Sequence, residues 1–253
     1  QIADSLYLQA GYTAHIRELI DESPVNRRKP YVYSDLGFYY LNEALQVLAD
    51  TSLDAYVEEN FYRFLGLENI GFHPLERFEP ARIMPTENDT VLRHRQIRGF
   101  VHDPLIALTG GAGGSAGLFS NAHDVGVIAQ MLLQGGEYGG IQYFNPGTVD
   151  LFTSNEFSPE DNRRGGGFDK PPADTSLPSP TAPSASISSF GHSGFTGTYF
   201  WVDPADGLVY VFLSNRVYPS AGNNLLTTLS IRTTIQEYLH QACTNRQKRN
   251  IRN

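Results

Sequence analysis

The distribution of apolar residues predicts a β-hairpin in the last quarter of the chain. Residues 198–202 and 208–213 are rich in aromatic and β-branched side chains, and residues 203–207 between them have the composition of a turn. Both runs are apolar at consecutive positions, as is typical of strands that are covered on both faces. The preceding segment, 191–197, mixes polar side chains with glycines, which indicates that another group approaches the backbone closely there.

The first two thirds of the chain have helical periodicity instead. Apolar residues recur at intervals of three or four, Ser52 and Ser120 are suited to cap helices, and Gly66 and Gly135 are suited to end them. The segments that we expect to be helical are 5–21, 35–48, 52–65, 121–134, 146–152 and 223–241. Residues 67–108 are expected to be irregular, with short helical turns, because prolines interrupt them repeatedly.

The remaining segments complete an α+β fold. Residues 163–169 are predicted as a further strand, and residues 169–189, rich in proline and serine, as a loop tip between strands of one sheet. Helices that precede strands, with one helix at the end, describe an antiparallel sheet with segregated helices. A regular alternation of strand and helix is missing from the pattern, which argues against a doubly wound sheet.

Composition and charge narrow the classes of function. The chain of 253 residues is 40% hydrophobic and 18% charged, and its formal net charge of −8 argues against a nucleic-acid partner. The single cysteine, Cys243, excludes an internal disulfide and a cysteine-based metal site. No apolar run is long enough for a membrane span. The basic residues within 246–253 are interpreted as a solvated tail behind the last helix.

Two short motifs and a glycine-rich turn carry the candidate chemistry. Tyr33-Ser34-Asp35 precedes a helix, His192-Ser193-Gly194 begins a core strand, and a turn at 110–117 precedes another helix. In order and spacing the set resembles the serine β-lactamase and penicillin-binding-protein superfamily, in its class C-related esterase and peptidase branch, from about Tyr31 to the last helix. That family combines a Ser-x-x-Lys nucleophile, a Tyr-x-Asn or Tyr-Ser-Asp motif, and a Lys-Thr-Gly or His-Ser-Gly strand. The resemblance implies a β-lactamase/transpeptidase-like fold.

The resemblance assigns roles to the tyrosine motif. It implies that Tyr33 is the general base and that Asp35 orients the substrate. A phenol titrates at about pH 10, so Tyr33 needs a nearby positive charge, which in the family comes from the motif lysine. Because Asp35 stands where the stricter pattern has asparagine, its ionised side chain accepts hydrogen bonds but does not donate them.

The resemblance also assigns substrate-binding roles to the strand motif. It implies that His192 meets the acidic end of the substrate, that Ser193 and Gly194 bind the substrate, and that the backbone N–H of Phe195 forms half of an oxyanion hole. His192 replaces a lysine of the stricter pattern, so it supplies only partial positive charge at pH 7. Both departures favour an esterase or peptidase-like activity over β-lactam hydrolysis. The family requires neither a cofactor nor a metal.

The sequence contains no Ser-x-x-Lys. The residues three positions before Lys29, Lys170 and Lys248 are Asn26, Gly167 and Asn245. We therefore expect residues 1–253 to be one N-terminally incomplete domain, with a mainly helical part at 1–160, strands and the last helix at 161–245, and the tail at 246–253. Its partners are expected to be a missing N-terminal segment or upstream domain and a small acyl substrate or peptidoglycan fragment. On this interpretation the nucleophile lies upstream and the chain is inactive alone. The resemblance suggests a periplasmic or secreted location.

Two alternatives remain. Residues 113–117 match Gly-x-Ser-x-Gly, which would make Ser115 the nucleophile of an α/β-hydrolase, provided that a strand leads into the turn and a helix leaves it. The chain also resembles ones that follow a family 3 glycoside hydrolase. In that case it would be a non-catalytic binding or accessory module of a cell-wall-active protein.

Overall fold

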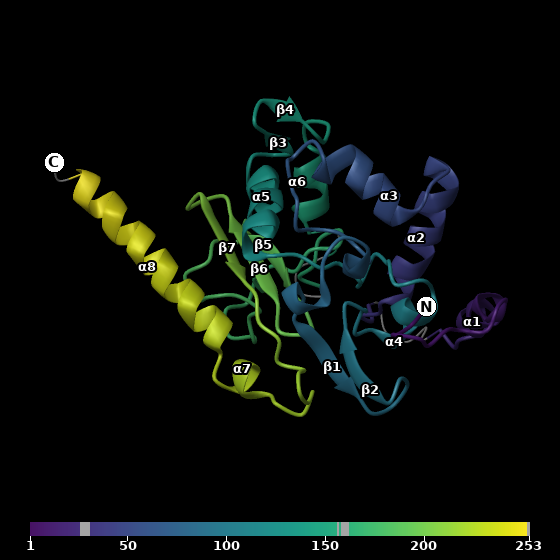
Figure 1. Ribbon diagram of the computed structural model, residues 1–253. Helices are drawn as coiled ribbons and strands as arrows, with labels where there is room; N and C mark the ends of the chain where they lie inside the picture. Colours follow the sequence, from purple (N-terminus) through teal and green to yellow (C-terminus); the bar gives the residue numbers. More distant parts are fainter. Residues whose placement is uncertain (26–30, 156, 158–161, 252–253) are drawn as a thin grey trace. The chain divides into compact units, whose positions relative to one another are not determined.

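The computed structural model (Figure 1) describes residues 1–25, 31–155, 157 and 162–251. The chain forms two compact units. Unit 1 comprises Gln1–Asn121 and Val217–Gly222, and unit 2 comprises Ala122–Arg216 and Asn223–Asn253. The helices between 122 and 153, which the sequence pattern groups with a helical part ending at 160, thus belong with the strands, because they pack directly against the sheet.

The helices of unit 1 follow the predicted pattern, with shifted ends. Helix α1 spans Tyr12–Asp21 rather than starting at residue 5, since Gly11 before it takes a left-handed conformation with φ of 81°. Helix α2 spans Leu36–Ala49. Helix α3 (Leu53–Val57) continues through a π-helical turn, η1 (Glu58–Tyr62).

The apolar positions at intervals of three and four along α2 are only partly covered. Leu41 is 63% exposed and Leu48 is 87% exposed, whereas Tyr39 is buried. Phe38 and Leu45 are partly buried, so the described residues of unit 1 cover this face of α2 incompletely.

A β-hairpin lies within the segment predicted to be irregular. Strands β1 (Pro85–Asp89) and β2 (Arg95–Arg98) pair antiparallel, between the short helical turns η2 (Pro74–Glu76) and η3 (Pro80–Arg82) on one side and helix α4 (Pro104–Leu108) on the other. The strands are polar and carry no apolar alternation. Their pairing depends instead on a side chain in the connecting loop, the buried Arg93.

Arg93 links this hairpin to the following segment. Its guanidinium donates to the Asp89 carboxylate at 2.6 Å, to the Glu87 carboxylate at 2.5 Å and to the Val101 carbonyl at 2.7 Å. Burial works to raise the pKa of Asp89, but hydrogen bonds from the Arg93 side chain and from three backbone N–H groups outweigh it and hold that pKa well below its usual range. A buried ion pair thus replaces the apolar core that a longer hairpin would have.

Unit 2 is built around the predicted hairpin. Strands β5 (Phe190–Ser193), β6 (Tyr199–Asp203) and β7 (Leu208–Phe212) form an antiparallel sheet in that order. Two further short strands, β3 (Glu137–Tyr138) and β4 (Ile141–Gln142), form a separate hairpin. Residues 163–168 form no strand. The backbone joins the sheet through a bridge between Asp169 and Gly191, because the arginine side chains of this segment turn back onto Asp169, while the Phe168 ring packs on Phe190.

Helices cover both faces of the three-stranded sheet. Phe190 and Val202 face helices α5 (Ala122–Leu133) and α6 (Thr148–Thr153), and together with Ala129 and Val149 they form one buried cluster. Tyr199, Trp201 and Tyr210 form the other cluster, on the opposite face. There the hydroxyl of Tyr199 donates to Gln236 of helix α8 (Ile231–Ile251) at 2.7 Å. The continuous apolar runs of the sequence therefore reflect two-sided burial, as predicted.

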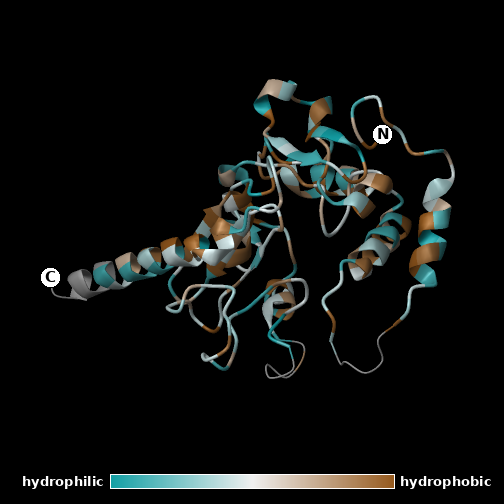
Figure 2. Cartoon of the chain, turned by 90° about the horizontal axis from the view of Figure 1, so that it is seen from below, coloured by the Kyte–Doolittle hydropathy of each residue, from teal (hydrophilic) through white to brown (hydrophobic). Residues whose placement is uncertain are grey.

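The last predicted helix is divided. Helix α7 covers Leu225–Thr228, Ser230 takes a left-handed φ of 50°, and α8 runs on to Ile251, through most of the segment expected to be a tail. Arg252 lies outside the described residues. Figure 2 shows the apolar residues of α8 in its N-terminal half. None of the helices in the described ranges has the length and apolar character to cross a membrane.

Candidate functional site

The tyrosine motif lies in unit 1, immediately before α2. The Ser34 hydroxyl accepts a hydrogen bond from the Leu36 N–H at 3.3 Å, and the Asp35 carbonyl accepts one from the Phe38 N–H at 3.0 Å. Asp35 occupies the N-cap position of α2, but its carboxylate makes no capping hydrogen bond. Tyr33 and Asp35 are both exposed, so the start of α2 presents a phenol and a carboxylate to solvent.

The glycine-rich turn of unit 1 is not a nucleophile elbow. Helix α4, rather than a strand, precedes it, and the next helix, α5, begins only at Ala122. The turn closes on itself through a hydrogen bond from the Gly113 N–H to the Ala116 carbonyl at 3.1 Å. Gly117 has φ of 108°, and a Cβ there would lie 2.3 Å from the Gly111 carbonyl oxygen. The alternative with Ser115 as an α/β-hydrolase nucleophile therefore lacks its required local structure.

The strand motif lies in unit 2, at the end of β5. His192 and Ser193 are the last residues of the strand, opposite Phe200 and Tyr199. The Gly194 N–H then donates to the Thr198 carbonyl at 2.8 Å and closes the turn into β6. A side chain at Gly194 would lie 2.2 Å from the Thr198 hydroxyl, and one at Gly191 would lie 2.5 Å from the Trp201 ring. The glycines of this segment thus permit close approach, as the sequence predicts.

An arginine that the sequence analysis did not identify contacts the motif histidine. Nη1 of Arg164 lies 3.0 Å from Nε2 of His192. A guanidinium only donates, so Nε2 of His192 accepts, and Nδ1 carries the proton that it donates to the Ser193 carbonyl at 2.9 Å. The imidazole in this arrangement is neutral, and the positive charge beside the motif belongs to Arg164.

A buried carboxylate positions this arginine. Nη2 of Arg164 donates to Asp169 at 3.2 Å, while the neighbouring Arg163 forms a bidentate pair with the same carboxylate at 2.7 and 3.0 Å. Asp169 is itself fixed to β5 by its two backbone hydrogen bonds with Gly191. Two adjacent arginines before a glycine run were the available sequence signal, but only the fold reveals which one reaches His192.

The turn after the motif is ordered by a second arginine. Nε of Arg216 donates to the Phe195 carbonyl at 2.8 Å, and its guanidinium lies 4.4 Å from the centre of the exposed Phe195 ring. The backbone N–H of Arg216 also donates to the Thr196 carbonyl at 2.9 Å. The peptide that the sequence analysis assigned to an oxyanion hole thus belongs to a turn held by side-chain and backbone contacts.

Comparison with known proteins decides the family. The sequence model of the Beta-lactamase family matches residues 9–232. The chain belongs to the β-lactamase family. Its α+β fold and the predicted resemblance to serine β-lactamases and penicillin-binding proteins are thereby confirmed, and the family is one of serine hydrolases.

Curated relatives of this β-lactamase family member carry the name "Putative D-alanyl-D-alanine carboxypeptidase". The protein from Escherichia coli K12 is 37% identical over 230 residues, which are 85% of this chain and 52% of the relative. The protein from Salmonella gallinarum is 34% identical over 236 residues, 88% of this chain and 54% of the relative. The chain thus spans about half the length of the curated relatives it matches.

Solved structures with lower sequence identity share the fold. A β-lactamase from Mycobacterium bovis has a TM-score of 0.56 at 20% identity, over 84% of this chain and 64% of that structure. A simvastatin synthase variant from Aspergillus terreus has a TM-score of 0.60 at 16% identity, over 92% of this chain and 61% of that structure.

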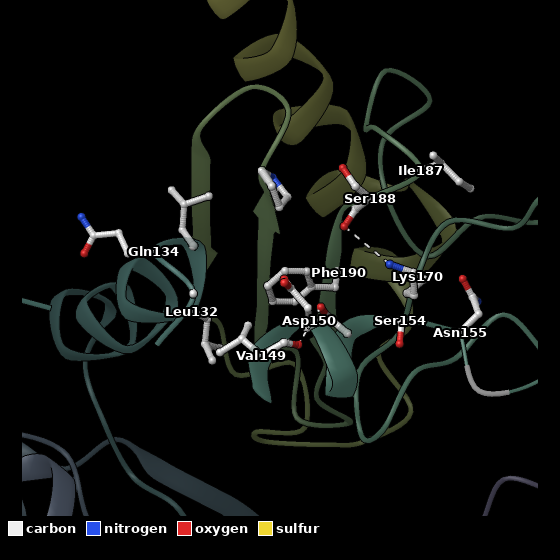
Figure 3. A pocket seen from close by; sticks show the side chains of 14 residues that line it. Leu132, Gln134, Val149, Asp150, Ser154, Asn155, Lys170, Ile187, Ser188 and Phe190 are labelled. Atoms are coloured by element: carbon white, nitrogen blue, oxygen red, sulfur yellow. Dashed lines mark hydrogen bonds between the residues drawn. The ribbon is translucent and has the colours of Figure 1, made fainter. Parts of the chain in front are cut away.

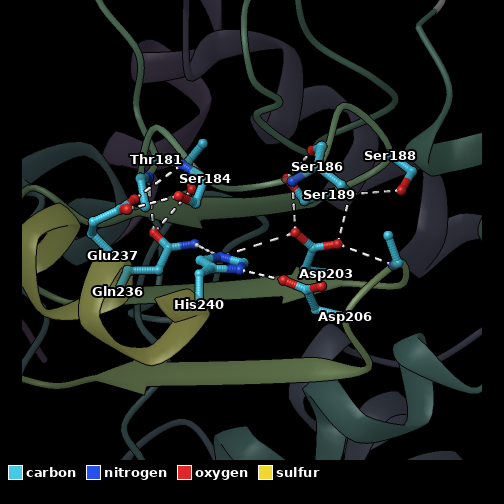
Figure 4. Close-up of polar contacts among 12 residues, drawn as sticks. Thr181, Ser184, Ser186, Ser188, Ser189, Asp203, Asp206, Gln236, Glu237 and His240 are labelled. Atoms are coloured by element: carbon cyan, nitrogen blue, oxygen red, sulfur yellow. Dashed lines mark hydrogen bonds and ion pairs between the residues drawn. The ribbon is translucent and has the colours of Figure 1, made fainter. Parts of the chain in front are cut away.

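One cluster of unit 2 has the composition of a metal site. Asp203, Asp206 and His240 offer ligand atoms within 4.8 Å of one another (Figure 4). The Asp203 carboxylate, however, accepts hydrogen bonds from the Ser186 N–H at 2.7 Å and from its hydroxyl at 2.6 Å, and Nδ1 of His240 lies 2.6 Å from Asp206. These contacts engage the same atoms that a cation would need. The cluster joins α8 to the β6–β7 turn and to the loop before β5.

The candidate residues therefore fall into two groups. Tyr33 and Asp35 belong to unit 1. His192, Ser193, Gly194 and Phe195 lie together at one end of the sheet in unit 2, beside Arg164 and Arg216. Asp103 serves the structure of unit 1, because its side chain caps α4 by accepting from the Ile106 N–H at 2.8 Å.

Proposed function

We propose that this chain supplies the tyrosine motif and the strand motif of a serine acyl-transfer enzyme that acts on substrates ending in a carboxylate. The observation that carries the proposal is the contact of Arg164 with His192 beside Ser193 and Gly194. This contact places a permanent positive charge at the end of β5, beside the strand motif of a member of a serine hydrolase family. A guanidinium suits a carboxylate because its planar N–H groups match the two carboxylate oxygens.

The proposed reaction uses a serine that lies outside this sequence. Its hydroxyl proton passes to Tyr33 as the serine oxygen attacks the substrate carbonyl, and the N–H of Phe195 contributes to stabilising the oxyanion. Tyr33 then returns the proton to the leaving amine or alcohol, and water releases the acyl group from the serine. Because no serine precedes a lysine by three positions, we expect this chain alone to be inactive.

The substrate class follows from the cation. The single N–H of a neutral His192 already donates to the Ser193 carbonyl, so the histidine has no donor for a terminal carboxylate, whereas Arg164 supplies a charge that does not titrate near neutral pH. Peptides ending in D-alanyl-D-alanine carry such a carboxylate, and the names of the curated relatives support this substrate. The proposal therefore favours a peptidase over an esterase of neutral esters, acting on peptidoglycan fragments in the periplasm or outside the cell.

Active-site labelling tests this function. The full-length protein that contains this chain, and the chain by itself, would be treated with a fluorophosphonate, and the modified peptide identified by mass spectrometry. We expect a label on a Ser-x-x-Lys serine of the full-length protein and none on residues 1–253. A label on Ser115 would contradict the proposal.

A non-catalytic module is the second candidate, favoured by the missing Ser-x-x-Lys. The same strand end would then bind a carboxylate-terminated peptidoglycan fragment without turnover, within a larger protein such as a fusion to a family 3 glycoside hydrolase. If fluorophosphonate does not label the full-length protein, and a peptide ending in D-alanyl-D-alanine binds measurably, this candidate would be favoured.

A further inference from the structure

A cavity in unit 2 lies away from the strand motif. It has a volume of about 650 Å³ and is lined by the C-terminal end of α5, by α6 and by the segments that lead into β5 (Figure 3). Phe190, the first residue of β5, lines it, whereas His192 and Ser193 at the other end of the strand do not. The cavity is thus separate from the residues of the proposed acyl transfer.

Lys170 gives the cavity a positive charge. Its side chain is buried, and among the residues that the structure describes its ammonium contacts the carbonyls of Ser188 at 3.5 Å and Ser189 at 3.3 Å. An ammonium has three N–H donors, and within residues 1–25, 31–155, 157 and 162–251 no carboxylate pairs with this one. Buried charges are ordinarily paired, so an ammonium that lines a cavity with two long carbonyl contacts is suited to an anionic ligand. Burial also lowers the pKa of the Lys170 amine, as expected for a cation without a counter-charge.

The acidic groups near Lys170 are engaged or solvated. Asp169, its neighbour in sequence, is taken up by Arg163 and Arg164. Asp150 of α6 lines the cavity but is exposed, so water screens its charge. Some of the backbone carbonyl groups at the end of α5 accept hydrogen bonds from the N–H groups of Gly135 and Gly136.

The cavity is polar around Lys170 and mostly apolar on the opposite side, where the exposed Gln134 lies at its edge. Figure 3 shows Lys170 with Ser188, Ser154 and Asn155 on one side, and Leu132 with Val149 on the opposite side, with Phe190 between them. Ile187 lies on the same side as Lys170 and Ser188 and is itself largely exposed. A ligand that spans this cavity needs an anionic head and an apolar body.

We infer that this cavity binds a small amphipathic carboxylate, with the carboxylate at Lys170 and the apolar chain across Phe190 toward Leu132. The site is distinct from the proposed acyl-transfer residues and does not depend on them. Octanoate is a suitable probe because it joins one carboxylate to a short unbranched chain.

Thermal unfolding of the protein in increasing octanoate tests the inference. A ligand that binds the folded state raises Tm with its concentration, so we expect a rise for the unaltered protein and none for Lys170→Met. The matched variant Lys170→Arg keeps the charge and is expected to retain most of the rise. Octanol and octylammonium, which have the same chain without the negative charge, are expected to give at most a fifth of the shift.

A second variant keeps the test decisive if Lys170→Met does not fold. Leu132→Ala shortens a partly buried side chain on the side of the cavity that the octanoate chain reaches, and it is expected to weaken octanoate binding at least threefold. Magnetisation transfer between the octanoate chain and the Phe190 ring would support the site directly. An equal Tm shift in unaltered protein and Lys170→Met, an equal response to octylammonium, or loss of fluorophosphonate labelling in octanoate would overturn the inference.

Discussion

Arg164 donates a hydrogen bond from Nη1 to Nε2 of His192 at 3.0 Å, and this contact fixes the proton of the histidine on the other ring nitrogen. The motif residue that the sequence presents as a partial cation is thus a neutral link between a guanidinium and the Ser193 carbonyl. The charge that meets a substrate at this strand end is the permanent one of the arginine.

The first prediction concerns the histidine tautomer. We expect His192 to be in the Nδ1–H form at pH 7, with Nε2 unprotonated, because the guanidinium of Arg164 can only donate. Long-range ¹H–¹⁵N correlation spectra of the histidine ring distinguish the two nitrogens. Arg164→Gln should release the constraint and give a mixture of tautomers, and predominant Nε2–H in the unaltered protein would contradict the contact.

The second prediction concerns the buried ion pair of unit 1. Arg93→Met leaves the carboxylates of Asp89 and Glu87 without their buried partner, which should lower the free energy of unfolding by about 3–5 kcal/mol. Denaturation in urea measures this loss. Arg63→Met, which removes an exposed arginine of the same unit, should change the free energy by less than about 0.5 kcal/mol. Equal effects of the two variants would show that Arg93 does not hold the hairpin.

The third prediction follows from the lowered pKa of Asp89. A carboxylate whose pKa is lower in the folded than in the unfolded state stabilises the fold above its unfolded pKa of about 4, and this stabilisation is lost as the pH falls toward the folded value. We expect the urea midpoint to fall between pH 5 and pH 3, and to fall less steeply in Asp89→Asn. Parallel pH profiles for the two proteins would be inconsistent with the pairing.

The fourth prediction concerns the close approach at β5. A Cβ at Gly191 would lie 2.2 Å from the Phe200 carbonyl oxygen and 2.5 Å from the Trp201 ring, so Gly191→Ala should cost about 3 kcal/mol or more. The fluorescence of Trp201, the single tryptophan, reports the disturbance. Gly126→Ala in α5 meets no atom within 4 Å and should stabilise the protein by up to about 1 kcal/mol. A neutral Gly191→Ala would contradict the packing.

Local signals in the sequence predicted the elements that have an apolar pattern. The β6–β7 hairpin, its turn at 203–207 and the helices α2 and α5 follow from composition, periodicity and capping residues alone. The polar hairpin β1–β2 escaped prediction because its stability comes from Arg93, whose partners are fixed only in the folded chain. The strand expected at 163–169 was wrong for a related reason: its arginine side chains fold back onto Asp169.

The motif residues could be predicted from the sequence, but their chemistry could be predicted only in part. The resemblance located His192 and the glycines after it. In the structure the Gly194 N–H closes the turn between β5 and β6, and a side chain at Gly194 would collide with Thr198. The resemblance could not identify Arg164, which lies 28 positions earlier and reaches His192 only through the bridge between Asp169 and Gly191. Which of two adjacent arginines makes the contact depends on tertiary structure.

Steady-state kinetics of Arg164→Gln in the full-length protein test the central proposal most directly. The comparison uses a peptide ending in D-alanyl-D-alanine, the same peptide with an amidated terminus, and a neutral acyl ester, with Arg163→Gln as the control that leaves the His192 contact in place. We predict that Arg164→Gln raises KM for the carboxylate peptide about tenfold, as expected for the loss of one charge-assisted hydrogen bond, and changes kcat/KM for the ester less than twofold. An equal loss on all three substrates, or an equal effect of Arg163→Gln, would contradict carboxylate recognition by Arg164.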